Sequence, residues 1–130
     1  MKFMILIHSN PLSRETWSNF TREQQEAGIQ YYAELTAELE RSGELVVSHA
    51  LADPAQGRRL PAKGQPAGGQ SAGSQSADGP FAEVKEHLAG FILVDCADLD
   101  RAVRIAERVP ESSLGLVEVR PAIDAADLVR

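Results

Sequence analysis

Two short apolar runs limit the folds that this chain can adopt. Residues 3–7 and 91–94 are apolar at every position and contain β-branched or aromatic side chains, which is typical of strands buried on both faces. The first run stops at His8-Ser9-Asn10-Pro11, too early for a secretory signal peptide. We therefore interpret it as the first strand of a cytoplasmic protein without a membrane segment.

Helix signals and further strand patterns lie between and after these runs. Thr21 and Gln24 match a capping box, and Gly43 stands where a C-cap is needed, which predicts a helix from about residue 22 to 42 with Tyr32 on its apolar stripe. Asp98 is the expected N-cap of a second helix that ends near residue 109. Further strands are expected at 44–51, 90–96 and 113–120, with a short one near 58–62, whereas 11–19 is expected to be irregular.

This order of elements predicts an α+β fold. Two helices on crossover connections give an antiparallel sheet with both helices on one face, the ferredoxin-like arrangement. Strands that are apolar on both faces then leave one face without a cover. The simplest cover is the same face of a second copy, so we expect a homodimer in which two sheets close into a dimeric α+β barrel.

Length and composition indicate one domain over residues 1–130. Residues 66–77 contain only Pro, Ala, Gly, Gln and Ser, so we interpret about 55–77 as a low-complexity loop insertion. The net charge of −6 disfavours nucleic acid as a partner, because phosphate contacts need clustered Lys and Arg. Arg58, Arg59 and Lys63 form the local basic cluster, which we interpret as a solvated loop.

The chain offers few groups for metal or covalent chemistry. Its single cysteine, Cys96, follows an apolar strand and is expected to be a small buried side chain. The three histidines have no metal-ligand spacing, and the Gly-rich segment lacks the ending of a phosphate-binding loop. We therefore expect no metal and no cofactor.

Residues 78–86 read Asp-Gly-Pro-Phe-Ala-Glu-Val-Lys-Glu and are followed by Gly90-Phe91, and residues 117–121 read Val-Glu-Val-Arg-Pro. These stretches resemble the DGPF-domain branch of the YCII-related proteins. The opening residues 1–7 fit the same branch. The resemblance implies a bacterial dimeric α+β barrel, often encoded beside extracytoplasmic-function sigma factors. Some relatives were proposed to be enzymes through a His on the first helix and an Asp before a Pro. Here the first helix has no His and Val109 precedes Pro110.

The loop at 78–86 is also the best candidate for a binding site. It places a tight turn, charged groups and the aromatic Phe81 directly ahead of a strand. Glu118 and Arg120 are expected on one face of the last strand, and His8 and His49 at strand ends. The candidate ligand-binding residues are Asp78, Phe81, Lys85, Glu86, Arg120 and His49.

Three functions remain open. The first is a small-molecule binding or sensing module that holds a polar or acidic ligand near Lys85 and Arg120. The second is an enzyme that draws an acid and a base from Asp78, Glu83, His49 or His8. The third is a structural or protein-interaction dimer, in which these charges are paired and no cavity exists.

Overall fold

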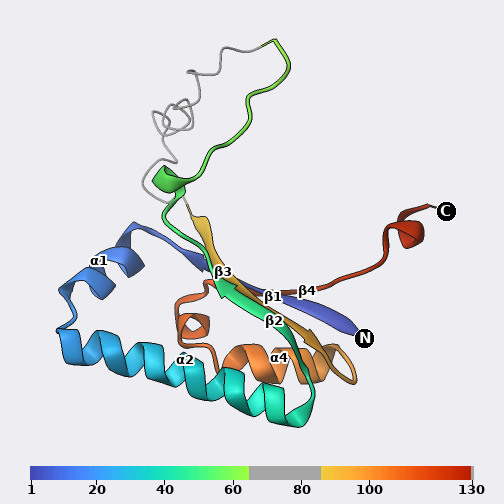
Figure 1. Ribbon diagram of the computed structural model, residues 1–130, viewed down its shortest axis with the longest axis horizontal. Coiled ribbons are helices and arrows are strands. Elements are labelled where there is room, and N and C mark those ends of the chain that lie inside the picture. Colours follow the sequence, from blue (N-terminus) through green and yellow to red (C-terminus); the bar gives the residue numbers. More distant parts are fainter. Residues whose placement is uncertain (65–85, 130) are drawn as a thin grey trace.

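The computed structural model describes residues 1–64 and 86–129 of the 130-residue chain. Its four strands form one antiparallel sheet in the order β2-β3-β1-β4 (Figure 1). The strands are β1 (Lys2–Ser9), β2 (Leu45–Ala50), β3 (His87–Asp95) and β4 (Val117–Pro121). The expected α+β class and antiparallel sheet are confirmed.

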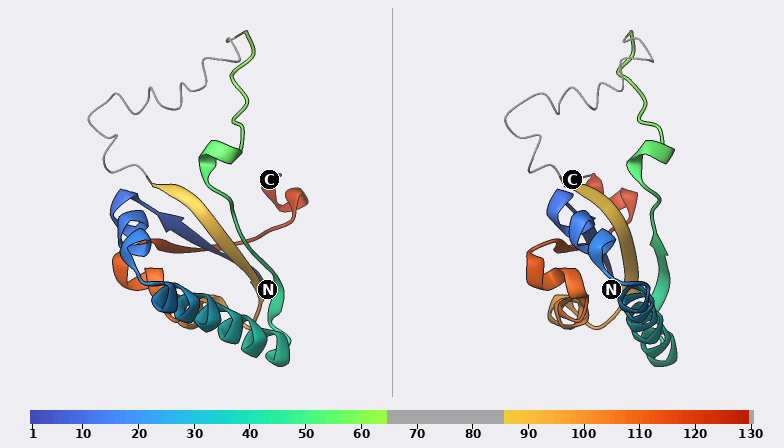
Figure 2. Two further views of the ribbon diagram at one scale, coloured as in Figure 1. Left: turned by 60° about the vertical axis from the view of Figure 1, so that its left-hand side comes forward. Right: turned by 90° about the vertical axis from the view of Figure 1, so that its left-hand side faces the viewer.

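Three α-helices of the described residues lie on the same side of this sheet (Figure 2). They are α1 (Pro11–Asn19), α2 (Arg22–Ser42) and α4 (Leu99–Glu107). Short 3₁₀ turns occur at η1 (Pro54–Gln56), η4 (Pro110–Leu114) and η5 (Ala125–Leu128). The sequence predicted only two helices, so the helix count was wrong by the one at residues 11–19.

Helix α1 forms because its first turn is capped from both directions. The Asn10 side chain accepts a hydrogen bond from the Ser13 N–H, and Ser13 Oγ accepts one from the Asn10 N–H, at 2.8 and 2.9 Å. Pro11 occupies the first helical position, where its missing N–H costs nothing. No residue of α1 is buried, so apolar periodicity gave no signal for it.

Helix α2 has the ends that its sequence predicts. Thr21 and Gln24 form the capping box, and Gly43 ends the helix at φ 80°, a left-handed conformation that favours glycine. Leu35 and Leu39 are buried against the sheet. The predicted helix at residues 22–42 is confirmed.

The core lies between the sheet and the helices. Register places Phe3 opposite Val94 and Ile5 opposite Ile92, and all four side chains are buried on the helix side. The residues that complete this core are Ile7, Leu35, Leu39, Cys96, Ala102, Ile105, Ala106 and Val109. Burial raises the pKa of the Cys96 thiol, which confirms its expected role as a small buried side chain.

Helix α4 is attached to the sheet by a cap and by an ion pair. Asp98 accepts a hydrogen bond from the Arg101 N–H, which confirms the predicted N-cap. The Arg101 guanidinium donates to both carboxylate oxygens of Glu44, ahead of β2, at 2.7 and 2.8 Å. This guanidinium lowers the pKa of Glu44 to about 2.

The remaining expectations need correction at three places. Residues 58–62 form no strand. The last strand begins at Val117 rather than 113, because η4 occupies 110–114 and Gly115 turns the chain at φ 73°. The strand expected at 90–96 starts earlier, at His87. Of the expected insertion at about 55–77, residues 65–77 lie outside the described part.

Candidate functional site

The structure describes three of the six predicted site residues, Glu86, His49 and Arg120. Asp78, Phe81 and Lys85 lie outside the described residues, and Glu86 is exposed directly before β3. His49 is on β2 and Arg120 is on β4, the two edge strands of the sheet. Three strand spacings of about 4.8 Å place these two strands roughly 14 Å apart. His49 and Arg120 are therefore not neighbours in the sheet.

Both residues nevertheless share the sheet face that the helices leave open. Register places His49 opposite Phe91, which lies opposite Leu6, and Arg120 lies opposite Met4. Because opposed residues point to the same side, this face also carries the half-buried side chains of Leu93 and Val47. We call the set Met4, Leu6, Val47, Phe91 and Leu93 the open-face stripe.

Charged side chains border the open-face stripe along β4. Arg120 Nε lies 3.8 Å from Glu118 Oε2, and His8 Nε2 lies 3.6 Å from Glu118 Oε1. The predicted placement of Glu118 and Arg120 on one face is thus confirmed. Their side chains are half or more exposed, so the pair contributes little to the stability of an isolated subunit.

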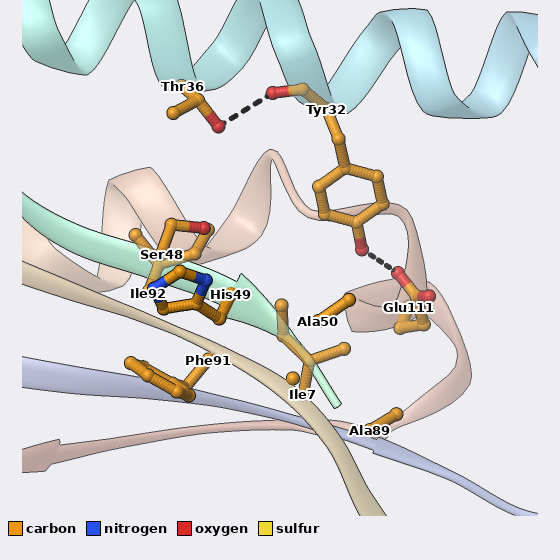
Figure 3. Close-up of a pocket in the computed structure, with 11 residues that line it drawn as sticks. Ile7, Tyr32, Thr36, Ser48, His49, Ala50, Ala89, Phe91, Ile92 and Glu111 are labelled. Carbon is orange, nitrogen blue, oxygen red and sulfur yellow. Dashed lines mark hydrogen bonds between the residues drawn. The ribbon is translucent and has the colours of Figure 1, made fainter. Parts of the chain in front are cut away.

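A cavity of about 240 Å³ lies under the helices at the ends of β2 and β3, and His49 and Phe91 of the open face contribute to its lining. Helix α2 supplies one wall, η4 another, and the ends of β2 and β3 form the floor (Figure 3). The cavity is partly open to solvent. It is lined by Ile7, Tyr32, Thr36, Ser48, His49, Ala50, Ala89, Gly90, Phe91, Ile92 and Glu111.

One phenol and one carboxylate give this cavity its polar end. Tyr32 reaches from α2 towards Glu111 on η4, and its hydroxyl donates a hydrogen bond to Glu111 Oε1 (Figure 3). Burial, and then this bond to Glu111, raises the pKa of Tyr32 above its ordinary value. The phenol therefore stays protonated and acts as a donor rather than as a base.

Gly90 keeps the floor of the cavity open. A Cβ at this position would lie 3.0 Å from the His49 carbonyl oxygen and 3.4 Å from the Ala50 Cα. Only glycine lets β2 and β3 approach this closely without a shift of one strand. Gly90 lies opposite Ile7, whose side chain also lines the cavity, so a side chain here would enter the same space.

Sequence reasoning did not find this pair. Tyr32 was expected on the apolar stripe of its helix, which is correct, but its hydroxyl partner is 79 residues away. The sequence offered only a general indication of this hydrogen bond, because a tyrosine on a buried stripe needs an acceptor for its O–H. No local pattern identifies Glu111 as that partner.

Comparison with known proteins identifies the family. The chain matches the model of the YCII-related domain over residues 1–126. It belongs to the YCII-related family. A 46-residue segment of this YCII-related chain is 54% identical to "Uncharacterized protein R00369" of Rhizobium meliloti (strain 1021). The matched segment makes up 34% of this chain and 37% of that protein. The name of that Rhizobium meliloti protein assigns no activity.

Neither a membrane-spanning helix nor a metal-binding cluster of side chains occurs among the described residues. None of the helices in residues 1–64 and 86–129 has the length and apolar character needed to cross a membrane. Across the same ranges, no three His, Cys, Asp or Glu side chains gather where they could hold a metal ion.

Proposed function

We propose that this YCII-related protein is a homodimeric small-molecule binding protein whose ligand occupies the cavity between α2, η4 and the ends of β2 and β3. The observation that carries the proposal is the cavity itself, which combines apolar walls with one convergent polar pair, Tyr32 and Glu111. Its volume of about 240 Å³ is below that of most drug-binding pockets, which favours a small ligand.

The polar pair indicates what the ligand carries. Tyr32 occupies one oxygen of Glu111, and no Lys or Arg of the described residues lies within ion-pair distance of that carboxylate. A ligand with an apolar body and a donor group, an amine or a hydroxyl, would complete the site. A carboxylic acid in the same orientation would be repelled by Glu111.

Titration with two probes of equal size tests this proposal. We expect n-butylamine to shift the NMR resonances of Tyr32 and Thr36 saturably, whereas butyrate does not. Glu111→Gln should weaken amine binding by at least about tenfold, because it removes the charge. Glu107→Gln, an exposed carboxylate outside the cavity, is the matched control. Absence of saturable amine binding, or equal binding by Glu111→Gln, would reject the site.

The dimer is proposed from the open-face stripe. All the described helices lie on the opposite side of the sheet, so this apolar face needs another cover, and a monomer seldom leaves more than a few hundred Å² bare. The β4 edge carries both signs, Glu118 and Arg120, so two copies related by a twofold axis present complementary charges. The partner is accordingly a second copy.

The segment after β4 supports the same arrangement. It leaves the body of the subunit and ends in η5 away from the helices (Figure 1). Ile123, Leu128 and Val129 are 58, 71 and 81% exposed on it. Apolar side chains on a projecting segment are well placed to pack against another copy.

The same features support three finer proposals. The strand order β2-β3-β1-β4 with helices on one side supports a ferredoxin-like subunit, and two such sheets facing each other would form the dimeric barrel. The sequence motif at 78–81 and the ending at 117–121 support the DGPF branch. The single reduced thiol of Cys96 is typical of a cytoplasmic protein.

Sedimentation equilibrium tests the dimer. We expect the wild-type protein to sediment as a dimer, and Leu6→Glu to sediment as a monomer with an unchanged circular dichroism spectrum, because the charge would be buried without a partner. Ile29→Glu, at a position on α2 that is 62% exposed, is the control. A monomeric wild-type protein, or a dimeric Leu6→Glu, would reject the open face as the interface.

A further inference from the structure

A second polar cluster lies where β1 ends and α1 begins. Ser9, the last residue of β1, lies opposite His87, the first residue of β3. The Ser9 Oγ and His87 Nε2 atoms are 2.8 Å apart, and Arg14 on α1 brings a guanidinium nitrogen to 2.9 Å from His87 Nδ1. Three elements thus contribute one side chain each. None of these residues lines the cavity under the helices.

The donors and acceptors of this cluster can be assigned from Arg14. A guanidinium has only donors, so His87 Nδ1 must accept from it. A neutral imidazole then carries its proton on Nε2 and donates to Ser9 Oγ. Ser9 consequently accepts from His87, and its own hydroxyl proton is free to point elsewhere.

Burial and charge together favour the neutral form of His87. Burial, and then the Arg14 guanidinium, lowers the pKa of His87, while the Asp53 carboxylate raises it and His8 lowers it. Asp53 itself accepts from the Ala55 N–H at 2.8 Å. In the neutral form, Nδ1 remains available to hold Arg14 in place.

This assignment excludes a serine nucleophile activated by His87. In a Ser–His pair that performs acyl transfer, the imidazole accepts the hydroxyl proton at one nitrogen, and the other nitrogen donates to a carboxylate. Here Nε2 donates to Ser9 Oγ instead of accepting from it, and Nδ1 accepts from Arg14 instead of donating, because a cation takes the place of the carboxylate.

Ser9 and Arg14 both keep donors that are not engaged by His87. Among the residues that the structure describes, Ser9 Oγ has His87 as its one hydrogen-bond partner, and Arg14 has no carboxylate within 4.0 Å. Arg101 and Arg108, in contrast, each donate twice to a glutamate. A hydroxyl and a guanidinium held side by side by one imidazole match an acceptor with negative charge.

We propose that Ser9, Arg14 and His87 form an oxyanion-binding site, in which Ser9 O–H and Arg14 N–H donate to a carboxylate or phosphate while His87 orients both. The site is separate from the cavity proposed for the amine or hydroxyl ligand, and its test does not depend on that proposal. His87 acts as a positioning residue.

The test uses inorganic phosphate and acetate as separate probes on the full chain. We expect saturable shifts of the Ser9, Arg14 and His87 resonances, with phosphate binding tighter if the natural ligand is a phosphate and acetate tighter if it is a carboxylate. Arg14→Gln keeps an N–H for His87 Nδ1 but loses the charge, so it should weaken binding by at least about tenfold. Arg104→Ala, an exposed arginine on α4, should bind as the wild type does.

Two further readouts separate binding from structure. The fluorescence of Trp17, the single tryptophan and part of α1, should be unchanged in Arg14→Gln if the helix keeps its place. Nitrogen-15 spectra of His87 should show the Nε2–H tautomer. A His87 protonated on Nδ1, or phosphate and acetate shifts that stay linear or persist in Arg14→Gln, would overturn the proposal.

Discussion

Along β1, Phe3, Ile5 and Ile7 alternate with Met4 and Leu6, and the two sets face opposite sides of the sheet. The first set is buried under the helices. The second set belongs to the open-face stripe and keeps part of its surface exposed. Similar side chains on one strand thus have different environments. The residue pattern of β1 is that of a strand covered on both faces, but the described subunit covers only one of them.

The largest loss of stability should come from truncating a side chain on the covered face, the face of the sheet that packs against the helices. Ile5 has no exposed surface, so Ile5→Ala should lower the free energy of unfolding by about 2–5 kcal/mol through lost burial and a new cavity. Leu6→Ala, its neighbour on the open face, is the matched comparison. Urea unfolding at low protein concentration should show a clearly smaller loss for Leu6→Ala. Equal losses would mean that the two faces are equally covered within one subunit.

Overpacking on the covered face should cost somewhat less. In Gly90→Ala the new methyl group meets the His49 carbonyl at 3.0 Å, so β2 must shift away from β3. We expect a loss of about 1–3 kcal/mol, measured by urea unfolding, together with weaker binding in the adjoining cavity. Ala97→Val, at an exposed position after β3, controls for the added bulk. An unchanged stability would show that this edge strand adjusts freely.

An ion pair beside the covered face should contribute less again, and in a pH-dependent way. Glu44→Gln should lower stability at pH 7 by about 1–2 kcal/mol, because the bond to Arg101 is bidentate but partly screened by solvent. Since the pKa of Glu44 is lowered from 4.5 to about 2, its contribution is complete above pH 4.5 and is lost as the pH falls towards 2. Acid titrations of unfolding should therefore be flatter for Glu44→Gln in that window.

The smallest effect is expected on the open face. Glu118→Gln should change the stability of an isolated subunit by less than about 0.5 kcal/mol, because the side chains of Glu118 and Arg120 are half or more exposed and their contact is long, at 3.8 Å. Thermal unfolding at two protein concentrations checks this. A loss that grows with concentration would locate Glu118 at the interface between two copies, whereas a large loss at every concentration would contradict its exposed position.

Local chemistry allowed most of the fold to be predicted. The α2 caps at Thr21 and Gly43, the Asp98 cap of α4 and the buried strands are each encoded within a few residues. Helix α1 was missed because it buries no side chain, and its local signals were only the Asn10–Ser13 capping box and Pro11 at the first helical position. Periodicity detects helices that pack by an apolar stripe, and α1 does not.

The candidate sites depend on contacts that no local pattern contains. The face of Arg120 followed from alternation along a strand, but the distance from His49 depends on the strand order. The Tyr32–Glu111 and Ser9–His87 pairs join residues 79 and 78 positions apart. Such contacts arise only when the sheet is assembled. The helices and strands could therefore be predicted from the sequence, but the residue pairs of the candidate sites could not.

The central place of β1 also has a consequence for how the chain folds. In the register of β1 with β3, Lys2 pairs with Asp95, and β4 pairs with β1 from the other side. During synthesis, β1 is therefore made long before either of its neighbouring strands, and such long-range pairing is slow.

Loop-closure entropy rises only slowly with loop length, by about 0.6 kcal/mol per doubling. The connection between β2 and β3 can thus vary in length at little cost to the folded state.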